Sequence, residues 1–377
     1  MEQFTGVLFT IASFLVALSV VVFVHEWGHL AVARRNGVRC ESFAIGFGHE
    51  IWGRTDRLGT RWKIGWLPLG GYVKMFGEGE TMSMVEGGSG ADADVEKPRL
   101  LTPEEKAVSF KHKTAGQRAA IVVAGPAVNI GFAVIVFWFM FLISGRPVTD
   151  PVIGAVLPDS AAAEAGLQAG DKITGIDGVA VERFEDIQRI IALAHGQAMT
   201  FAVERDGAGL DVSATPRIVE DEDVFGNVQK HALLGISVSR DARRMEQGGP
   251  IQSLGWAIEQ CYVVMEGTVV AVGQMIRGAR GTEDLGGPIR IAKYSGQAAK
   301  SGPFNFVIFV AILSLNLGMI NLLPVPLLDG GHLLFYAIEA VRGRPLSEHV
   351  QEWGLRIGLA LVLSLMVFVT WNDIVQF

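Results

Sequence analysis

Long uncharged apolar runs are the feature that most constrains this chain. Three of them cover residues 4–24, 119–145 and 304–328, and none contains Asp, Glu, Lys or Arg. Each reaches the length of about 20 apolar residues that a helix needs to span a bilayer. A shorter run, 357–372, reaches that length when it is extended through Arg356, whose long side chain can carry its charge toward the membrane surface. The sequence therefore predicts a polytopic α-helical membrane protein with about four transmembrane helices.

Composition excludes several other classes of protein. Half of the residues are hydrophobic and 19% are charged, against about 25% charged in an ordinary soluble domain, so the chain is not intrinsically disordered. A net charge of -7 argues against a nucleic-acid partner, because such binders present basic surfaces. The two cysteines, Cys40 and Cys261, cannot form a disulfide framework. The first apolar run follows Glu2 without a preceding Lys or Arg, which favours a retained helix over a signal peptide.

The distribution of basic residues predicts the orientation of these helices. Lys and Arg are denser in the first loop, 31–118, than in the second, 144–303, and the short loop 341–352 contains two arginines. Because basic loops tend to stay in the cytoplasm, we expect the first and third loops on the cytoplasmic side. Both termini and the second loop then lie on the outer face.

The loops themselves predict folded parts. Glycine-punctuated segments with interleaved tryptophans at 42–76 predict short strands near the membrane surface. An apolar helical spacing at 184–194 and an Asp-Gly hairpin signal at 206–207 predict a small α+β domain. A mostly apolar stretch at 251–276 contains acidic and amide residues, which favours an amphipathic helix over a fifth span. The predicted division is a first transmembrane helix (1–35), a cytoplasmic-side loop with a membrane-associated β-hairpin region (36–115), a second transmembrane helix (116–145), the α+β domain (148–218), an outer-face linker with the amphipathic helix (219–303), a broken third transmembrane segment (304–340) and a fourth transmembrane helix (353–376).

A metal-binding pattern lies at the end of the first span. The sequence there reads His-Glu-Trp-Gly-His from His25 to His29. Two histidines four positions apart project from one helix face and can share one Zn²⁺, while Glu26 is placed to take a proton from the water that the metal activates. The alternative is a solvated helix end, but ionisable groups next to a membrane span are costly and usually functional.

A third zinc ligand is expected from another polar group within the membrane. Asp329 ends the third apolar run, just after Pro324 and Pro326. Prolines break a helix, and irregular backbone at membrane depth is tolerated where it lines a cavity or is buried in protein. His332 is a rival ligand, since imidazole also binds zinc.

Five motifs together give the chain a family resemblance. Besides the histidine pattern, the sequence contains Asn-x-x-Pro-x-Pro-x-Leu-Asp-Gly-Gly at 321–331, Ala-Gly-Pro-x-x-Asn at 124–129, Gly-Leu-x-x-Gly-Asp at 166–171 followed by Asp-Gly, and Gly-Pro-Ile-x-Ile-Ala at 287–292. Over nearly its whole length the chain resembles the site-2 protease family of intramembrane zinc metalloproteases. The bacterial regulator-of-sigma-E protease branch is the nearest in pattern.

The resemblance implies a site and a biological role. It implies one Zn²⁺ per chain held by His25, His29 and Asp329, with Glu26 as the base. It implies that the α+β domain is a PDZ domain, of which this chain has one copy where some relatives have two. This domain is expected either to bind a peptide or a trimmed C-terminus, or to exclude bulky substrates. It further implies a bacterial inner-membrane enzyme, with the termini and PDZ domain on the periplasmic side and the active site near the cytoplasmic side. Its expected substrates are single-span membrane proteins, such as anti-sigma factors or polarity and signalling proteins, cut by regulated intramembrane proteolysis.

Four polar or helix-breaking residues are candidates for substrate contact: Asn321, Pro324, Pro326 and Asn129. Asn129 equally suits helix packing. For Asn321 substrate contact is favoured over the alternative, which is pairing with groups that the prolines free. Strands around 64–75 offer either an edge for an extended peptide or a structural cover. Two other functions are alternatives: a non-catalytic PDZ membrane scaffold, and a metal transporter, which would need further intramembrane ligands and often an internal repeat.

Overall fold

The chain forms two compact units, which are described separately. The computed structural model describes residues 2–78, 101–193, 197–222, 228–239, 242–277 and 286–375. The helical unit comprises Met1–Phe137, Ala257–Val269 and Thr282–Phe377, and the α+β unit comprises Trp138–Trp256 and Val270–Gly281. Part of the predicted cytoplasmic-side loop, 79–100, lies outside the described residues.

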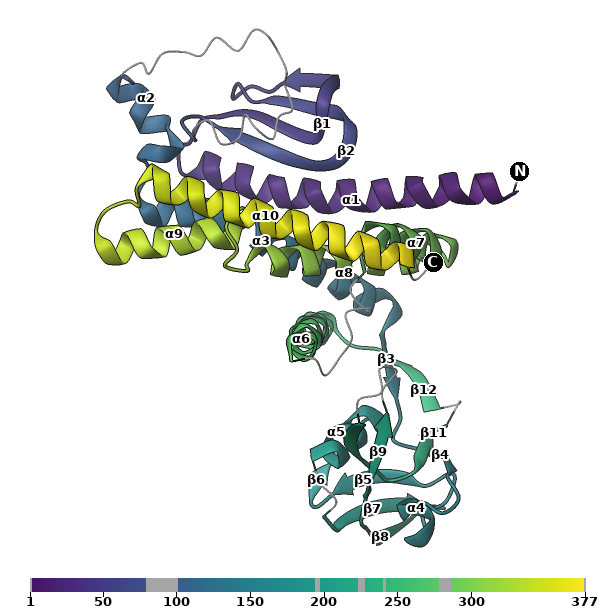
Figure 1. The fold of residues 1–377 in the computed structure, drawn as a ribbon. Helices are drawn as coiled ribbons and strands as arrows, with labels where there is room; N and C mark the ends of the chain where they lie inside the picture. The colour runs from purple at the N-terminus through teal and green to yellow at the C-terminus, as the bar shows by residue number, and fades with distance from the viewer. Residues whose placement is uncertain are drawn as a thin grey trace. The chain divides into compact units, whose positions relative to one another are not determined.

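Four helices are long and apolar enough to cross a membrane, in agreement with the four predicted spans (Figure 1). They lie in α1 (Glu2–Arg35), α3 (Ala115–Ser144), α8 (Pro303–Asn321) and α10 (Glu348–Val375). The 27-residue helix α6 (Pro250–Ile276) covers the predicted amphipathic segment and is not among these four. The remaining helices of this part of the chain are α2 (Pro103–Val108), the 3₁₀ turn η2 (Phe110–His112), α7 (Pro288–Lys300) and α9 (Asp329–Arg342).

The third span is broken where the sequence predicts. Helix α8 ends at Asn321, and α9 begins only at Asp329. Proline lacks an N–H and clashes with the preceding turn, so the helix cannot continue through the two prolines between them. Gly330 and Gly331 allow the turn to fold back on the start of α9, because a Cβ on either would overlap main-chain carbonyl groups of the turn.

The strand region is an antiparallel pair, β1 (Cys40–Thr55) and β2 (Arg61–Met75), in which both strands double back. Residues 42–45 of β1 pair with the first part of β2 on one side and with its last part on the other. The later part of β1 pairs with the first part of β2 as well. Gly46 and Gly48 have φ of 83° and 81°, a left-handed conformation that glycine adopts without strain, and they provide the bend. The structure therefore has two long, bent strands where the sequence predicts a series of short ones, because the glycines bend β1 without ending it.

A buried cluster joins this sheet to the helices next to the histidine pattern. Its members come from the end of α1 and the link that follows it, from both strands, from η2 and from the start of α3, and side chains of α9 pack against it. Burying such side chains contributes about 1.5–3 kcal/mol each. Consequently the last turns of α1 are held on three sides. The buried members are Leu30, Ala33, Val38, Cys40, Phe43, Val73, Met75, Phe110, Ile121 and Val122.

The α+β unit is built on a four-stranded antiparallel sheet, whose strands follow one another in the order β6 (Val179–Ala180), β5 (Lys172–Ile176), β7 (Met199–Arg205) and β8 (Ala208–Ala214). The predicted hairpin is confirmed, since β7 and β8 pair across Asp206 and Gly207. The helix α5 matches the predicted helical segment. The elements are β3 (Arg146–Thr149), β4 (Ile153–Val156), α4 (Ala161–Glu164), β5 (Lys172–Ile176), β6 (Val179–Ala180), α5 (Phe184–Leu193), β7 (Met199–Arg205), β8 (Ala208–Ala214), β9 (Arg217–Glu222), β10 (Val228–Leu233), β11 (Ile236–Val238) and β12 (Arg243–Glu246).

The predicted end of this domain at residue 218 is too early. Strand β11 pairs with β4, and β12 pairs with β3. Leu234 is 2% exposed and belongs to the same core as the sheet. Pairing between strands some 80 residues apart leaves no local signal, which is why the sequence did not indicate it. Residues to at least 246 therefore belong to the α+β unit and not to a linker.

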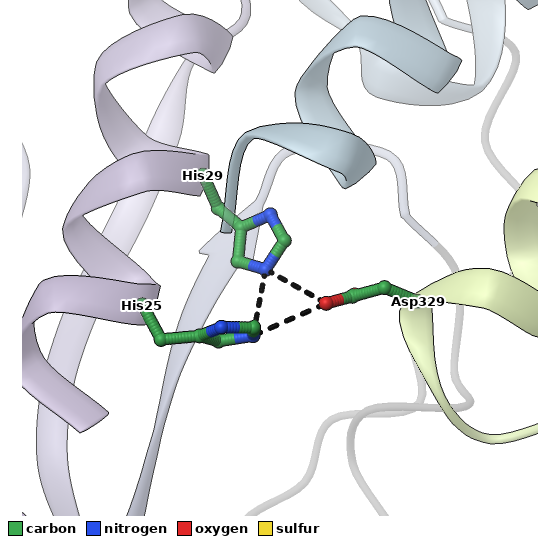
Figure 2. A group of neighbouring side chains, drawn as sticks. All are labelled: His25, His29 and Asp329. Atoms are coloured by element: carbon green, nitrogen blue, oxygen red, sulfur yellow. Dashed lines mark hydrogen bonds and ion pairs between the residues drawn. The ribbon is translucent and has the colours of Figure 1, made fainter. Parts of the chain in front are cut away.

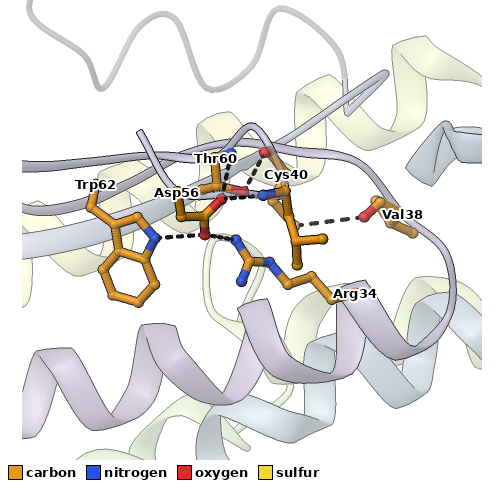
Figure 3. A network of polar contacts seen from close by, with 7 residues as sticks. Arg34, Val38, Cys40, Asp56, Thr60 and Trp62 are labelled. Atoms are coloured by element: carbon orange, nitrogen blue, oxygen red, sulfur yellow. Dashed lines mark hydrogen bonds and ion pairs between the residues drawn. The ribbon is translucent and has the colours of Figure 1, made fainter. Parts of the chain in front are cut away.

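A polar network fastens the β1–β2 turn to the end of α1 (Figure 3). The Asp56 carboxylate accepts hydrogen bonds from the Arg34 guanidinium, from Trp62 Nε1 at 2.9 Å and from the N–H of Thr60 at 3.0 Å. Thr60 in turn donates from Oγ1 to the Cys40 carbonyl oxygen at 2.7 Å. Burial by itself raises the pKa of Asp56, but these donors outweigh it and lower the pKa to about 2.

We expect Asp56→Asn to loosen the sheet locally. The amide oxygen can still accept from main-chain N–H groups, but the charge-assisted bond to Arg34 is lost, at a cost of about 1.5–3 kcal/mol. Amide hydrogen exchange in residues 40–75 should therefore accelerate by at least about tenfold. Glu50→Gln is the matched control, because the Glu50 pair with Arg61 lies at the surface, where solvent screens an ion pair. Equal effects of the two substitutions would contradict the anchoring role of Asp56.

The same network predicts a pH dependence. Because folding lowers the pKa of Asp56 from 3.8 to about 2, the carboxylate stabilises the sheet fully above its unfolded pKa. That contribution is lost as the pH falls from 3.8 through about 2. Hydrogen exchange should show this acid-induced loss in the wild type and not in Asp56→Asn.

Candidate metal centre

Three side chains from two elements converge beside α3 (Figure 2). His25 and His29 lie one turn apart on α1, and Asp329 is the first residue of α9. The two Nε2 atoms are 3.2 Å apart, and Asp329 Oδ2 lies 3.1 Å from that of His25 and 3.5 Å from that of His29. Both histidines are 8% exposed. The broken third span thus brings its carboxylate to the face of α1 that carries both imidazoles.

The geometry of this group fits a zinc ion. Ligand distances of 2.0–2.1 Å in a tetrahedron place donor atoms about 3.3–3.4 Å apart, close to the three separations observed. Asp329 Oδ2 is buried and has no hydrogen-bond partner of proper geometry within the described residues. Two imidazole nitrogens and one carboxylate oxygen are a donor set that zinc favours, and they leave a fourth position open. Among the residues that the structure describes, this is the one such cluster of His, Cys, Asp and Glu.

Close approach of α3 to α1 holds the two rings in place. A Cβ on Gly125 would overlap the ring atoms of His25 and His29. A Cβ on Gly28, between the two histidines, would meet the Ala124 carbonyl group and the Gly125 Cα. Both positions therefore require glycine for the helices to come this close. The remaining nitrogen of His29, Nδ1, lies 2.9 Å from the Ile121 carbonyl oxygen, which orients that ring.

Glu26, the predicted base, faces the sheet. Its carboxylate is hydrogen-bonded by the main chain of Val73 in β2. The Cα of Gly71 also lies close, since a Cβ there would be 3.2 Å from Glu26 Cγ. The last segment of β2 therefore passes directly beside the histidine pattern.

The other predicted residues lie at different distances from this group. His332 stays outside the group, and its ring contacts Phe335 and Tyr336 at centroid distances of 6.3 and 6.5 Å. Asn321 ends α8 and is half-buried. The two prolines of the turn differ: Pro324 is exposed, while Pro326 is packed so closely that a Cβ on Gly331 or Gly358 would overlap it. Asn129 is fully buried, with its amide 3.2 Å from His25 Nδ1.

Sequence reasoning missed one acidic neighbour, Glu78, just after β2. Its carboxylate accepts a hydrogen bond from the Met75 N–H at 3.2 Å and interacts electrostatically with His29 and Glu26. Burial raises the pKa of Glu78 to about 7, although the hydrogen bond lowers it. A single acidic residue in a Gly- and Glu-rich stretch gives no signal in the sequence. Its place depends on the end of β2 packing against α1.

Comparisons with known proteins identify the family of this chain. The model of Peptidase family M50 matches residues 13–365, and the chain belongs to this family. A protein of Rhizobium meliloti (strain 1021) that carries a zinc metalloprotease name is 42% identical over 97% of this chain and 96% of its own. Another of that name from Mesorhizobium japonicum is 43% identical, over 97% and 98%. The regulator of sigma-E protease RseP of Salmonella typhimurium is 32% identical over 98% of this chain and 99% of its own.

Membership establishes the activity. The chain is an intramembrane zinc metalloprotease, as predicted, and zinc is its cofactor. The non-catalytic scaffold and the metal transporter are thereby set aside. One solved structure, the PDZ domain of an SdrC-like protein from Listeria monocytogenes, covers 24% of this chain and 87% of its own at 23% identity, with a TM-score of 0.19. That score is too low to assign the fold of the α+β unit.

We expect Gly125→Ala to weaken zinc binding without unfolding the protein. The atoms that the new methyl group would overlap are the ends of the two histidine rings, so the rings must turn away. Disturbing ligand orientation costs about 10–100-fold in metal affinity. Gly131→Ala is the matched control on the same helix, because nothing lies within 4 Å of its added Cβ. Competition with a chromophoric chelator measures the zinc dissociation constants of the two variants. Equal zinc affinities of Gly125→Ala and Gly131→Ala would contradict the role of Gly125.

Proposed function

We propose that His25, His29 and Asp329 hold one Zn²⁺ per chain and that Glu26 is the general base. The observation that carries this proposal is the clustering of their three donor atoms, all within 4.8 Å of one another. The tetrahedral spacing supports it, as does the buried Asp329 Oδ2, which has no hydrogen-bond partner of proper geometry among the described residues. His332 is left outside the ligand set.

Each residue has a separate task in this scheme. When bound, zinc supplies a Lewis acid that polarises the scissile carbonyl and activates water. Glu26 accepts a proton from the attacking water and later donates it to the leaving amine nitrogen. The main-chain hydrogen bond from Val73 orients the Glu26 carboxylate for both transfers. Low exposure of the two histidines limits bulk water around them.

We propose that the substrate is a transmembrane segment that unwinds before it is cut. A regular helix hides each carbonyl in its own hydrogen-bond ladder. The last segment of β2 runs beside Glu26, and an unwound substrate adding to it as a strand would regain main-chain hydrogen bonds. The turn between α8 and α9 is the second surface for it, with Asn321, Pro324 and Pro326 as contact residues. The packing of Pro326 against α10 favours a supporting role for that residue over direct contact.

The likeness to a regulator of sigma-E protease supports a substrate class. We propose single-span regulatory membrane proteins, such as anti-sigma factors or polarity and signalling proteins, released by regulated intramembrane proteolysis in a bacterial inner membrane. The basic first loop supports a cytoplasmic position for the β1–β2 sheet and the active site. The termini and the α+β unit then face the periplasm. That unit has the Gly-Leu-x-x-Gly-Asp motif of a PDZ domain, and we propose that it binds or filters trimmed substrates.

A panel of three variants tests the proposed residues. Glu26→Gln should keep zinc and lose about 10²–10⁴-fold in cleavage rate, because only the base is removed. Asp329→Ala should lose zinc and activity together, whereas His332→Ala should keep zinc. Zinc content and cleavage of a membrane-inserted substrate are measured on the same preparations. If His332→Ala loses zinc and Asp329→Ala keeps it, His332 and not Asp329 is the third ligand. If Glu26→Gln is fully active, Glu26 is not the general base.

The unwinding step predicts a dependence on helix propensity. Relative to Ala, Gly costs a helix about 0.8–1.0 kcal/mol and Pro about 3 kcal/mol. Replacing Gly, Asn or Pro near the scissile bond by Leu or Ala should therefore slow cleavage. Introducing Gly or Asn into a resistant span at the depth of the histidines should speed it. Cleavage rates across such a series, with membrane insertion checked separately, decide the question. Rates that follow side-chain volume and ignore helix propensity would rule out unwinding as the limiting step.

A further inference from the structure

Asn129 lies in the middle of α3, and its position is tightly fixed. The residue is 0% exposed. Its main-chain carbonyl oxygen accepts a hydrogen bond from Ser314 Oγ at 3.1 Å. The α8 backbone is so near that a Cβ on Gly318 would lie 3.2 Å from Asn129 Cβ. A side chain enclosed in this way has no surface to offer a substrate. Its polar group must instead serve a neighbour.

That neighbour is His25. The amide nitrogen Nδ2 of Asn129 lies 3.2 Å from His25 Nδ1. The amide oxygen Oδ1 is buried without a hydrogen-bond partner in the part of the chain that the structure describes. Leaving such an oxygen unpaired costs about 1–3 kcal/mol. Turning the amide by half a revolution would exchange the two atoms and place the oxygen against the ring nitrogen.

The chemistry of the metal site decides between the two orientations. A neutral imidazole carries its one ring proton on either Nδ1 or Nε2. His25 directs Nε2 toward His29 and Asp329, so the Nε2 lone pair is free for zinc only when the proton is on Nδ1. A protonated Nδ1 needs a hydrogen-bond acceptor. The amide nitrogen of Asn129 can only donate, whereas its amide oxygen can accept.

We infer that Asn129 is a positioning residue of the metal centre: its amide oxygen accepts the Nδ1 proton of His25 and fixes the ring form whose Nε2 faces the metal. This inference rests on the proposed zinc ligands. The Ile121 carbonyl serves His29 in the same way. Ile121, Gly125 and Asn129 follow one another at intervals of four, so one face of α3 supports both rings.

Two substitutions with opposite hydrogen-bonding capacity test the inference in the full-length protein. Asn129→Leu keeps a similar volume but removes the acceptor, and zinc affinity should fall about 10–100-fold. Asn129→Asp provides only acceptor oxygens, so its zinc dissociation constant should stay within about threefold of the wild type. Ser314→Ala is the control for packing around Asn129, because it removes a neighbouring hydrogen bond that does not involve His25. It should leave zinc affinity unchanged.

The outcomes separate this inference from the proposed ligand set. Zinc alone is the probe, measured by competition with a chromophoric chelator, and His25→Ala is run alongside. If the amide nitrogen were the partner of Nδ1, Asn129→Asp would oppose two acceptors and bind zinc as weakly as Asn129→Leu. That result, or wild-type zinc affinity in Asn129→Leu, would overturn the role of Asn129. If His25→Ala binds no zinc in the same experiment, the proposed zinc ligands are still supported. Wild-type affinity in His25→Ala would instead overturn the ligand set itself.

Discussion

The close contact between α1 and α3 is the constraint on which the rest of the site depends. The helices run in opposite directions there, since His29 meets Ile121 while the earlier His25 meets the later Asn129. Glycine at positions 28 and 125 lets the backbones approach until α3 lies against the imidazole rings. Without a driving hydrophobic force between helices in lipid, such packing and hydrogen bonding are what hold helices together.

A second constraint is the cost of irregular backbone within a membrane. The turn between α8 and α9 frees carbonyl groups in a setting where water cannot satisfy them, so it must be enclosed by protein or line a cavity. Gly330 and Gly331 let the turn close on itself, and Gly358 of α10 lets Pro326 pack against the last helix. The gain is a carboxylate at the start of a helix, aimed at α1. The break therefore brings the Asp329 carboxylate to the two histidines.

The β1–β2 sheet links the chemistry to a polar anchor outside the predicted spans. Its last segment holds Glu26 through the main chain of Val73, while its turn is fastened to Arg34 through Asp56. Both attachments are to α1, about two turns apart. The sheet is thus positioned by the same helix that carries Glu26 and the two histidines.

The sequence alone determined the local parts of this protein. Helical spacing places His25 and His29 on one face, apolar length predicts four spans, and two prolines predict the break before Asp329. Tertiary structure decided what no local pattern encodes: that Asp329 rather than His332 joins the histidines, that Asn129 contacts His25, that Glu78 lies near them, and that β11 returns to β4 to extend the α+β unit past residue 218. The reason is physical. Spacing along a helix or strand is fixed by covalent geometry, whereas each of these contacts joins segments distant in sequence and depends on how closely two backbones can pack.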